Sequence, residues 1–157
     1  MPSSKSRTAL VAAACGLLAT LTALPAAAQF RNADAAIKYR QSAMSLQGNH
    51  MARLFAMING QVPFDAKVAG DNIETIAMLN RLQFAAFIDG SDKGNTRAKP
   101  EIWAEKEKFN AAIAKSQDDV SMLAVAGKTG NLDQIKTAAG AVGASCKACH
   151  DAYQKPQ

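Results

Sequence analysis

Residues 131–153 read NLDQIKTAAGAVGASCKACHDAY, and this stretch decides the fold class because it has the features of one long amphipathic helix. Asn131 is a favourable N-cap, and Gln134 three residues later completes the sequence pattern of a capping box. Residues at spacings of three, four and seven share one helical face, namely Ile135, Val142, Cys146, Cys149, His150 and Tyr153. The pattern predicts a helix that carries two cysteines and a histidine on its packed face.

Three further helical stretches precede this one, separated by Gly, Pro, Asn and Asp. The first runs from about Asp34 to Ile58, and the second runs from an N-cap at Asp65 to about Leu82. The polar residues 88–99 predict a loop. The third begins at Pro100, which suits a first helical turn, carries apolar residues through Leu123 and ends around residues 127–130. No stretch alternates with period two for long enough to form a strand. We therefore predict an all-α fold, an antiparallel four-helix bundle.

Residues 1–28 have the layout of a secretory signal peptide. Lys5 and Arg7 form a positive start, residues 8–24 are apolar, and residues 25–28 (PAAA) form a small-residue cleavage site. The cleavage site favours removal over a retained membrane anchor. A lipoprotein cut before Cys15 is a weaker alternative, because Ala12 rather than a large aliphatic residue stands three positions earlier. We expect residues 29–157 to form one domain in the periplasm, without membrane association.

Charge and cysteine content exclude several classes of function. The 157-residue chain has a net charge of +5, which falls to +3 when Lys5 and Arg7 are removed, because no acidic residue leaves with them. A weakly positive chain without a block of Lys and Arg argues against nucleic acid as a partner. The exported chain keeps only Cys146 and Cys149. A disulfide between them closes too short a loop to stabilise the fold, so another role explains the pair.

The sequence Cys146-Lys147-Ala148-Cys149-His150 matches C-x-x-C-H, the signature of c-type haem attachment. On a helix the thiols of Cys146 and Cys149 and the imidazole of His150 share a face. The two thiols can therefore add to the two vinyl groups of one haem while the imidazole binds the iron. A thioredoxin-like redox site needs a βαβ pattern that is not visible here. A zinc site needs four ligands, and the exported chain offers two Cys and two His. We therefore predict one covalently bound haem c.

Two glycines interrupt the same helix. Gly140 and Gly143 each cost about 1 kcal/mol relative to Ala in a helix interior. Small residues there allow a large flat group to approach the backbone, so these glycines agree with a bound cofactor.

The haem motif lies near the C-terminus, with seven residues after it, and the rest of the exported chain is helical. This arrangement resembles the class II cytochromes c, and most closely their cytochrome c′ branch. The segments that carry the resemblance are Tyr39-Arg40-Gln41, Phe84-Ala85-Ala86-Phe87, Pro100-Glu101-Ile102-Trp103 and residues 143–153. The last of these is the most specific.

The resemblance implies a haem attached near the C-terminal end of the fourth helix, with His150 as the axial ligand of a five-coordinate, high-spin iron. It places Met44 over the opposite side of the iron, Arg40 and Gln41 at the haem edge, and Phe87 among the cofactor contacts. Arg40 lies near a propionate, which suits the bidentate geometry of a guanidinium.

Three positions depart from the usual family pattern. Gln154 stands where a basic residue commonly follows the tyrosine of the motif. Arg97 stands where an acidic residue is common, and we expect it to pair with a propionate instead. Gln83-Phe84 replaces a Pro-Trp pair of some relatives.

Three functions are compared, two implied by this resemblance and one from another class. In the first, an apolar distal side without a hydrogen-bond donor takes up NO and CO, for NO protection or alongside electron transfer. In the second, Met44 and His150 both ligate the iron of a low-spin electron carrier. The third is an enzyme, which lacks a visible acid–base pair, because His50 lies roughly 240° round the helix from Met44 and is expected at the surface. We favour the first, in a homodimer formed by the first two helices and served by an unidentified redox partner.

Overall fold

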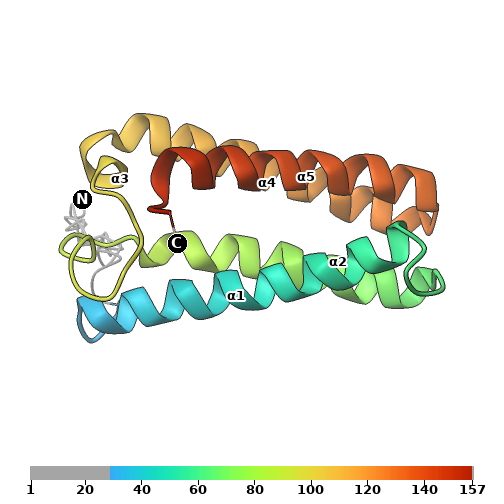
Figure 1. Ribbon diagram of the computed structural model, residues 1–157, viewed down its shortest axis with the longest axis horizontal. Helices are drawn as coiled ribbons and strands as arrows, with labels where there is room; N and C mark the ends of the chain where they lie inside the picture. Colours follow the sequence, from blue (N-terminus) through green and yellow to red (C-terminus); the bar gives the residue numbers. More distant parts are fainter. Residues whose placement is uncertain (1–28, 157) are drawn as a thin grey trace, which may run out of the picture.

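The computed structural model describes residues 29–156, so the predicted signal peptide lies outside the described residues. Four long helices run along the molecule, α1 (Ala33–Ile58), α2 (Ala66–Gln83), α4 (Lys106–Thr129) and α5 (Leu132–Tyr153). Two short elements lie between α2 and α4, the 3₁₀ turn η2 (Phe84–Ala86) and α3 (Glu101–Ala104) (Figure 1). The predicted antiparallel four-helix bundle is confirmed.

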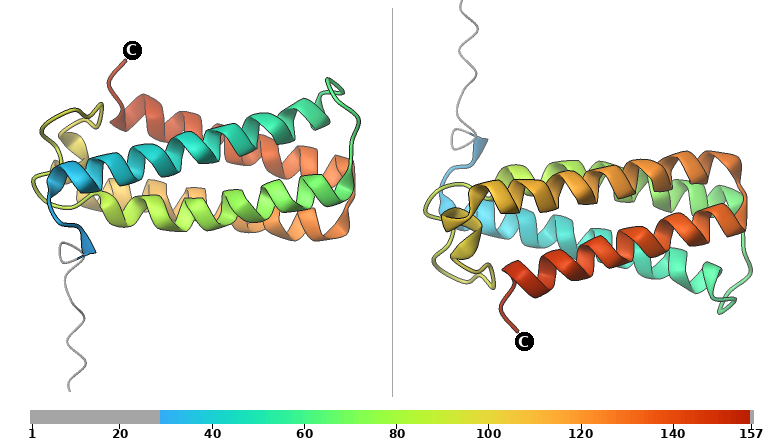
Figure 2. Two further views of the ribbon diagram at one scale, coloured as in Figure 1. Left: turned by 90° about the horizontal axis from the view of Figure 1, so that it is seen from below. Right: turned by 90° about the horizontal axis from the view of Figure 1, so that it is seen from above.

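The bundle has two layers of two helices. In the two further views, α1 lies beside α2 in one layer and α4 lies beside α5 in the other (Figure 2). Helix α2 also packs closely on α4, whereas α1 and α5 make few contacts with each other. The layers are therefore joined tightly along one side and loosely along the other.

The predicted N-caps are present. The side chain of Asp65 accepts from the N–H of Val68, and that of Asn131 accepts from the N–H of Gln134. Only half of the predicted capping box forms, because the N–H of Asn131 donates to Thr129 Oγ1 at 3.1 Å instead of to the Gln134 side chain. The left-handed Gly130 before it (φ 64°) makes the turn between α4 and α5 this tight.

The prediction of one continuous third helix is wrong. The chain leaves helical geometry at Glu105 (φ −116°, ψ 49°), and Pro100 is the N-cap of α3 rather than its first residue. The break lets α3 fold back on the preceding loop, where Ile102 is buried and Trp103 Nε1 donates to the carbonyl of Ile88 at 3.1 Å.

Two apolar clusters occupy opposite ends of the bundle. The larger joins the second half of α1 with the start of α2, the second half of α4 and the start of α5, and includes Leu54, Ile76, Leu123, Ile135 and Val142, all buried. The smaller surrounds Ile102 and Phe109 at the other end, together with Phe84, Phe87, Trp103, Cys149 and Tyr153. Among residues 29–156, no helix is long and apolar enough to cross a membrane.

Candidate functional site

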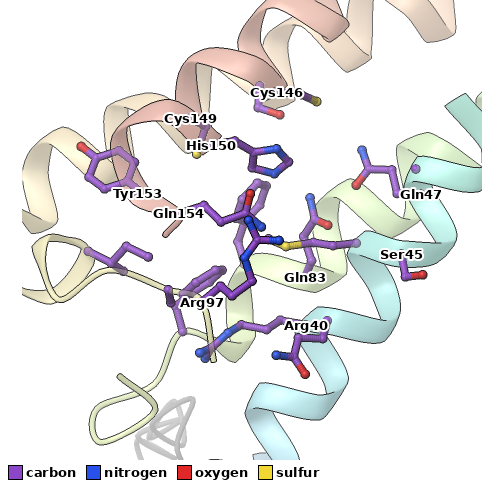
Figure 3. A pocket seen from close by; sticks show the side chains of 18 of the residues that line it. Arg40, Ser45, Gln47, Gln83, Arg97, Cys146, Cys149, His150, Tyr153 and Gln154 are labelled. Carbon is purple, nitrogen blue, oxygen red and sulfur yellow. The ribbon is translucent and has the colours of Figure 1, made fainter. Parts of the chain in front are cut away.

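The C-x-x-C-H motif lies in the last turns of α5. Cys146 and Cys149 are free, half-buried thiols, and both pack against apolar clusters. Positions 146, 149 and 150 are separated by three and four residues, so the two thiols and the imidazole of His150 lie on one helical face. In the close view, His150 and both cysteines come from the same helix and flank a pocket (Figure 3).

The pocket lies between this face of α5 and residues 40–55 of α1, where the two layers of the bundle make few contacts. Its volume is about 670 Å³, within the range of about 300–1,000 Å³ that is usual for ligand and cofactor sites. Most of its wall is apolar and includes Met44, Met51, Phe55, Phe84, Ile102 and Phe109. The site can therefore hold a large, mainly apolar group next to two thiols and an imidazole.

All eight residues that the sequence analysis singled out line this one pocket: Arg40, Gln41, Met44, Phe87, Arg97, Cys146, Cys149 and His150. They come from α1, α5 and the loop between α2 and α3. The structure thus brings together side chains separated by more than a hundred positions in the sequence.

Arg40 is buried, with 1% of its surface exposed, and ties α1 to the loop after η2. Its Nη1 donates to the carbonyl of Ala86 at 3.0 Å and to Ser91 Oγ at 2.7 Å. Its Nη2 donates to the carbonyl of Ser91 at 2.6 Å and to Thr96 Oγ1 at 2.9 Å. Burial lowers the pKa of Arg40 to about 10, so the guanidinium stays charged at neutral pH.

The guanidinium of Arg40 also lies over an aromatic ring, 4.6 Å from the centroid of Phe87. Because an arginine has five N–H donors, the four hydrogen bonds to the loop leave one, at Nε, for any further acceptor. The expected bidentate pairing of Arg40 with a carboxylate therefore requires the loss of at least one bond to the loop.

The other two polar residues of the pocket edge also have protein partners. Gln41 Nε2 donates to the carbonyl of Asn95 at 2.9 Å. Arg97 donates to the carbonyl of Lys155 from Nε at 3.0 Å and from Nη2 at 2.6 Å. The backbone of Arg97 in turn accepts from the N–H of Lys155 at 2.8 Å, which joins the loop wall of the pocket to the C-terminal segment.

The surroundings of the motif alter its acid–base properties. Burial raises the pKa of both thiols, and the negative charge of Asp119 raises that of Cys146 further. Partial desolvation and the charge of Arg97 lower the pKa of His150, against the opposing effect of Asp151. A neutral imidazole is the form that binds a metal.

Sequence reasoning missed two buried glutamines in the pocket wall. Gln47 on α1 and Gln83 on α2 are 5% and 4% exposed. Gln47 Nε2 and Gln83 Oε1 have no hydrogen-bond partner among the described residues. The expectation of a pocket without a hydrogen-bond donor is therefore wrong. A sequence signal existed, since Gln47 lies on the stripe that includes Met44 and Met51, at a spacing that predicts burial.

Two other expectations are partly wrong. His50 does lie outside the pocket wall, but it is half-buried, and its Nδ1 is 2.8 Å from Asn72 Oδ1 rather than solvated. Of the two glycines in α5, Gly143 lines the pocket, where a Cβ atom at its position would be 3.6 Å from Phe55. Gly140 is exposed and lies outside the pocket wall, so it has no part in admitting a flat group.

Comparison with known proteins assigns the chain to a family. The family model described as Cytochrome C′ matches residues 35–154. Cytochrome c′ of Rubrivivax gelatinosus is 47% identical over 128 residues, covering 81% of this chain and 99% of that protein. The chain belongs to the cytochrome c′ family. This is a family of non-enzymatic haem proteins.

Solved structures of cytochrome c′ have the same fold. The crystal structure of the Rubrivivax gelatinosus protein gives a TM-score of 0.79 and covers 81% of this chain and all of that one. A ferrous variant of cytochrome c′ from Alcaligenes xylosoxidans with bound NO is 41% identical, with a TM-score of 0.77, over 82% and 99% of the two chains. A carbon monoxide complex of another variant of that protein gives the same TM-score at 42% identity, over 81% and 99%.

Membership of the cytochrome c′ family implies haem c, and the residues present fit that group. Two thiols and an imidazole stand on one wall of a mainly apolar pocket. The same pocket holds two unpaired polar atoms, Gln47 Nε2 and Gln83 Oε1, which lack partners within the protein. A bound group would bury the apolar wall and give these atoms neighbours.

Proposed function

We propose that this chain is a periplasmic mono-haem cytochrome of the c′ type, with a five-coordinate, high-spin iron that binds NO and CO. Its role is electron transfer or protection against NO. The observation that carries the proposal is the single pocket that holds Cys146, Cys149 and His150 on one side and the apolar side chain of Met44 on another. The iron, when bound, supplies the site of gas uptake and one-electron exchange.

Each residue of the pocket then has a defined task. Cys146 and Cys149 would hold the haem covalently, and the neutral imidazole of His150 would bind its iron. Met44 would cover the iron without bonding to it, which would leave room for a small ligand. Phe87 packs at the cofactor edge.

Charged and polar groups at the open edge orient the propionates. Arg97 lies in the wall near the end of α5, and Arg40 and Gln41 lie across from it on α1. Arg40 has its Nε–H for this purpose while its other four N–H groups hold the loop. Two basic groups beside two carboxylates balance their charge, which a mainly apolar pocket requires.

The relatives support gas binding. Structures of the Alcaligenes xylosoxidans cytochrome c′ contain NO or CO, and that protein is 41–42% identical to this chain. Met44 and most of the pocket wall are apolar, which suits a neutral diatomic molecule.

The alternative is a low-spin electron-transfer cytochrome in which Met44 binds the iron opposite His150. Its support is that Met44 and His150 line the same pocket, so the thioether is within the site. Optical spectra of the ferric and ferrous protein separate the two. We expect high-spin spectra for the wild-type protein, and we expect the Met44→Ala variant to be high-spin as well. A low-spin spectrum with a methionine-to-iron charge-transfer band, lost in Met44→Ala, would establish the alternative.

We also propose a homodimer formed by the outer faces of α1 and α2. Leu46 on α1 and Met78 and Leu82 on α2 are exposed by 42–49%, so both helices carry apolar side chains at the surface. Sedimentation of the haem-loaded protein tests this. We expect a dimer that Leu46→Lys dissociates, and a monomeric wild-type protein would contradict it.

Fractionation of cells that express the full chain tests the periplasmic location, and the haem protein in the cytoplasmic fraction would contradict that.

A further inference from the structure

Gln47 is a buried hydrogen-bond donor that faces the pocket and has no acceptor. It is 5% exposed, and its Nε2 has no partner among the described residues. Burial of a donor without a partner costs free energy, so such groups in folded proteins usually meet a ligand or water. In the close view, Gln47 extends from α1 toward the side of the pocket that carries His150 (Figure 3).

The position of Gln47 along the bundle matches that of His150. Helices α1 and α5 are antiparallel, and the Phe55 ring lies opposite Gly143, 3.6 Å from where a Cβ would stand. Each helix rises about 1.5 Å per residue. Seven residues from Gly143 toward the open end of the pocket lead to His150, and the same distance along α1 leads from Phe55 to Gly48, the neighbour of Gln47. Gln47 therefore lies at the level of His150 along the bundle, and Met44 lies about one turn further along α1.

Two of the other donor side chains in the wall already have acceptors within the protein. Gln41 Nε2 is bonded to the carbonyl of Asn95, and Arg97 is bonded to the carbonyl of Lys155. The unpaired atom of Gln83 is its Oε1, which accepts a hydrogen bond and repels negative charge. Gln47 thus carries a buried, unpaired N–H in the pocket wall, one turn of α1 from Met44.

We propose that the Gln47 carboxamide donates a hydrogen bond to the ligand in this pocket and so favours small anionic ligands, of which fluoride is the probe. A neutral ligand such as CO gains little from the same N–H. This inference rests on the proposed function, because it requires a haem with an open position on the Met44 side. The Gln47 side chain on α1 would then determine which small ligands the pocket prefers.

The test is a fluoride titration of the ferric, haem-loaded protein and of its Gln47→Met variant, in which a thioether of similar length replaces the amide. Gln47→Leu provides a second apolar variant. We expect at least about tenfold weaker fluoride binding in both variants, or about 1.4 kcal/mol. The affinity of the ferrous protein for CO should change by less than about twofold, because a neutral ligand gains little from a hydrogen bond of the Gln47 amide.

Two further measurements do not depend on fluoride. The stretching frequency of CO in the ferrous complex should rise in Gln47→Met, because loss of a donor near the oxygen strengthens the C–O bond. The melting temperature of haem-loaded Gln47→Met without fluoride or CO should equal or exceed that of the wild type, because an unpaired buried donor has been removed. Gln83→Met is the matched control, since it removes the other unpaired amide of the pocket without removing the Gln47 donor.

The outcomes separate this inference from the proposed function. Optical spectra are recorded first, and a haem-free or low-spin protein would refute both. In a high-spin protein, equal fluoride affinities of wild type and Gln47→Met, or no fluoride uptake at all, would overturn the inference alone. It would also be overturned if Gln83→Met weakened fluoride binding as much as Gln47→Met, since that result means the two amides act as a structural pair.

Discussion

Replacement of Arg40 by methionine tests whether this residue mainly holds the protein together or mainly binds the cofactor. Arg40→Met removes four hydrogen bonds between α1 and the loop at residues 86–96. Two of the acceptors keep another hydrogen bond, since Ser91 Oγ donates to the carbonyl of Ile88 and Thr96 Oγ1 accepts from the N–H of Ala98. The carbonyls of Ala86 and Ser91 lose their arginine donor.

The size of the effect follows from these two carbonyls. Each buried acceptor without a partner costs about 1–3 kcal/mol, so the pair costs about 2–6 kcal/mol. Removal of a buried charge and burial of the methionine side chain offset part of that loss. We expect the free energy of unfolding to fall by about 3 kcal/mol, which lowers the melting temperature by about 10 °C in a domain of this size.

Urea unfolding of the haem-loaded protein, followed by far-ultraviolet circular dichroism, measures this change. Arg53→Met is the matched control, because Arg53 is exposed on the same helix and its replacement should change the free energy of unfolding by less than about 0.5 kcal/mol. An Arg40→Met protein as stable as that control, but with an altered reduction potential, would refute the reasoning. It would show that the guanidinium acts chiefly on the cofactor.

Two further predictions concern α5 and its neighbour. Cys146→Ala/Cys149→Ala should yield the bare polypeptide mass and lose the cooperative thermal transition, because the apolar wall of a 670 Å³ pocket is left facing water; native circular dichroism and melting temperature would contradict this. Gly140→Ala should stabilise the protein by about 0.5–1 kcal/mol in urea unfolding, because its Cβ meets nothing within 4 Å. Gly127→Ala should lack that gain, because its Cβ would lie 3.0 Å from Ile73 Cδ1, and equal gains at both positions would count against this packing argument.

Local signals in the sequence predicted the parts of the fold that depend on neighbouring residues. The N-caps at Asp65 and Asn131 act on N–H groups three residues away, so their effect is visible in the sequence alone. The same is true of the motif on α5, whose three groups share one turn of helix. The placement of Arg40, Met44 and Arg97 in one pocket came from the family resemblance, because no local pattern relates these distant positions.

Features that depend on distant contacts were not predicted. The break at Glu105 is explained by the bond from Trp103 to Ile88 and by the burial of Ile102, and neither contact has a sequence spacing that reveals it. The Thr129 hydroxyl, rather than the Gln134 side chain, accepts from the N–H of Asn131. The left-handed turn at Gly130 brings that hydroxyl to Asn131. Gln47 is a polar residue on an apolar stripe, and only the structure shows that its amide faces a pocket.

The link between the loop and the chain end has a practical consequence. The backbones of Arg97 and Lys155 are joined, Lys99 N donates to the carbonyl of Tyr153 at 2.9 Å, and Ala98 pairs with Gln154. Residues 153–155 therefore hold the segment that carries Arg97 in place. An affinity tag fused close behind them, or trimming of these residues by a carboxypeptidase, would strain or break these hydrogen bonds, so material for ligand-binding measurements is better tagged elsewhere.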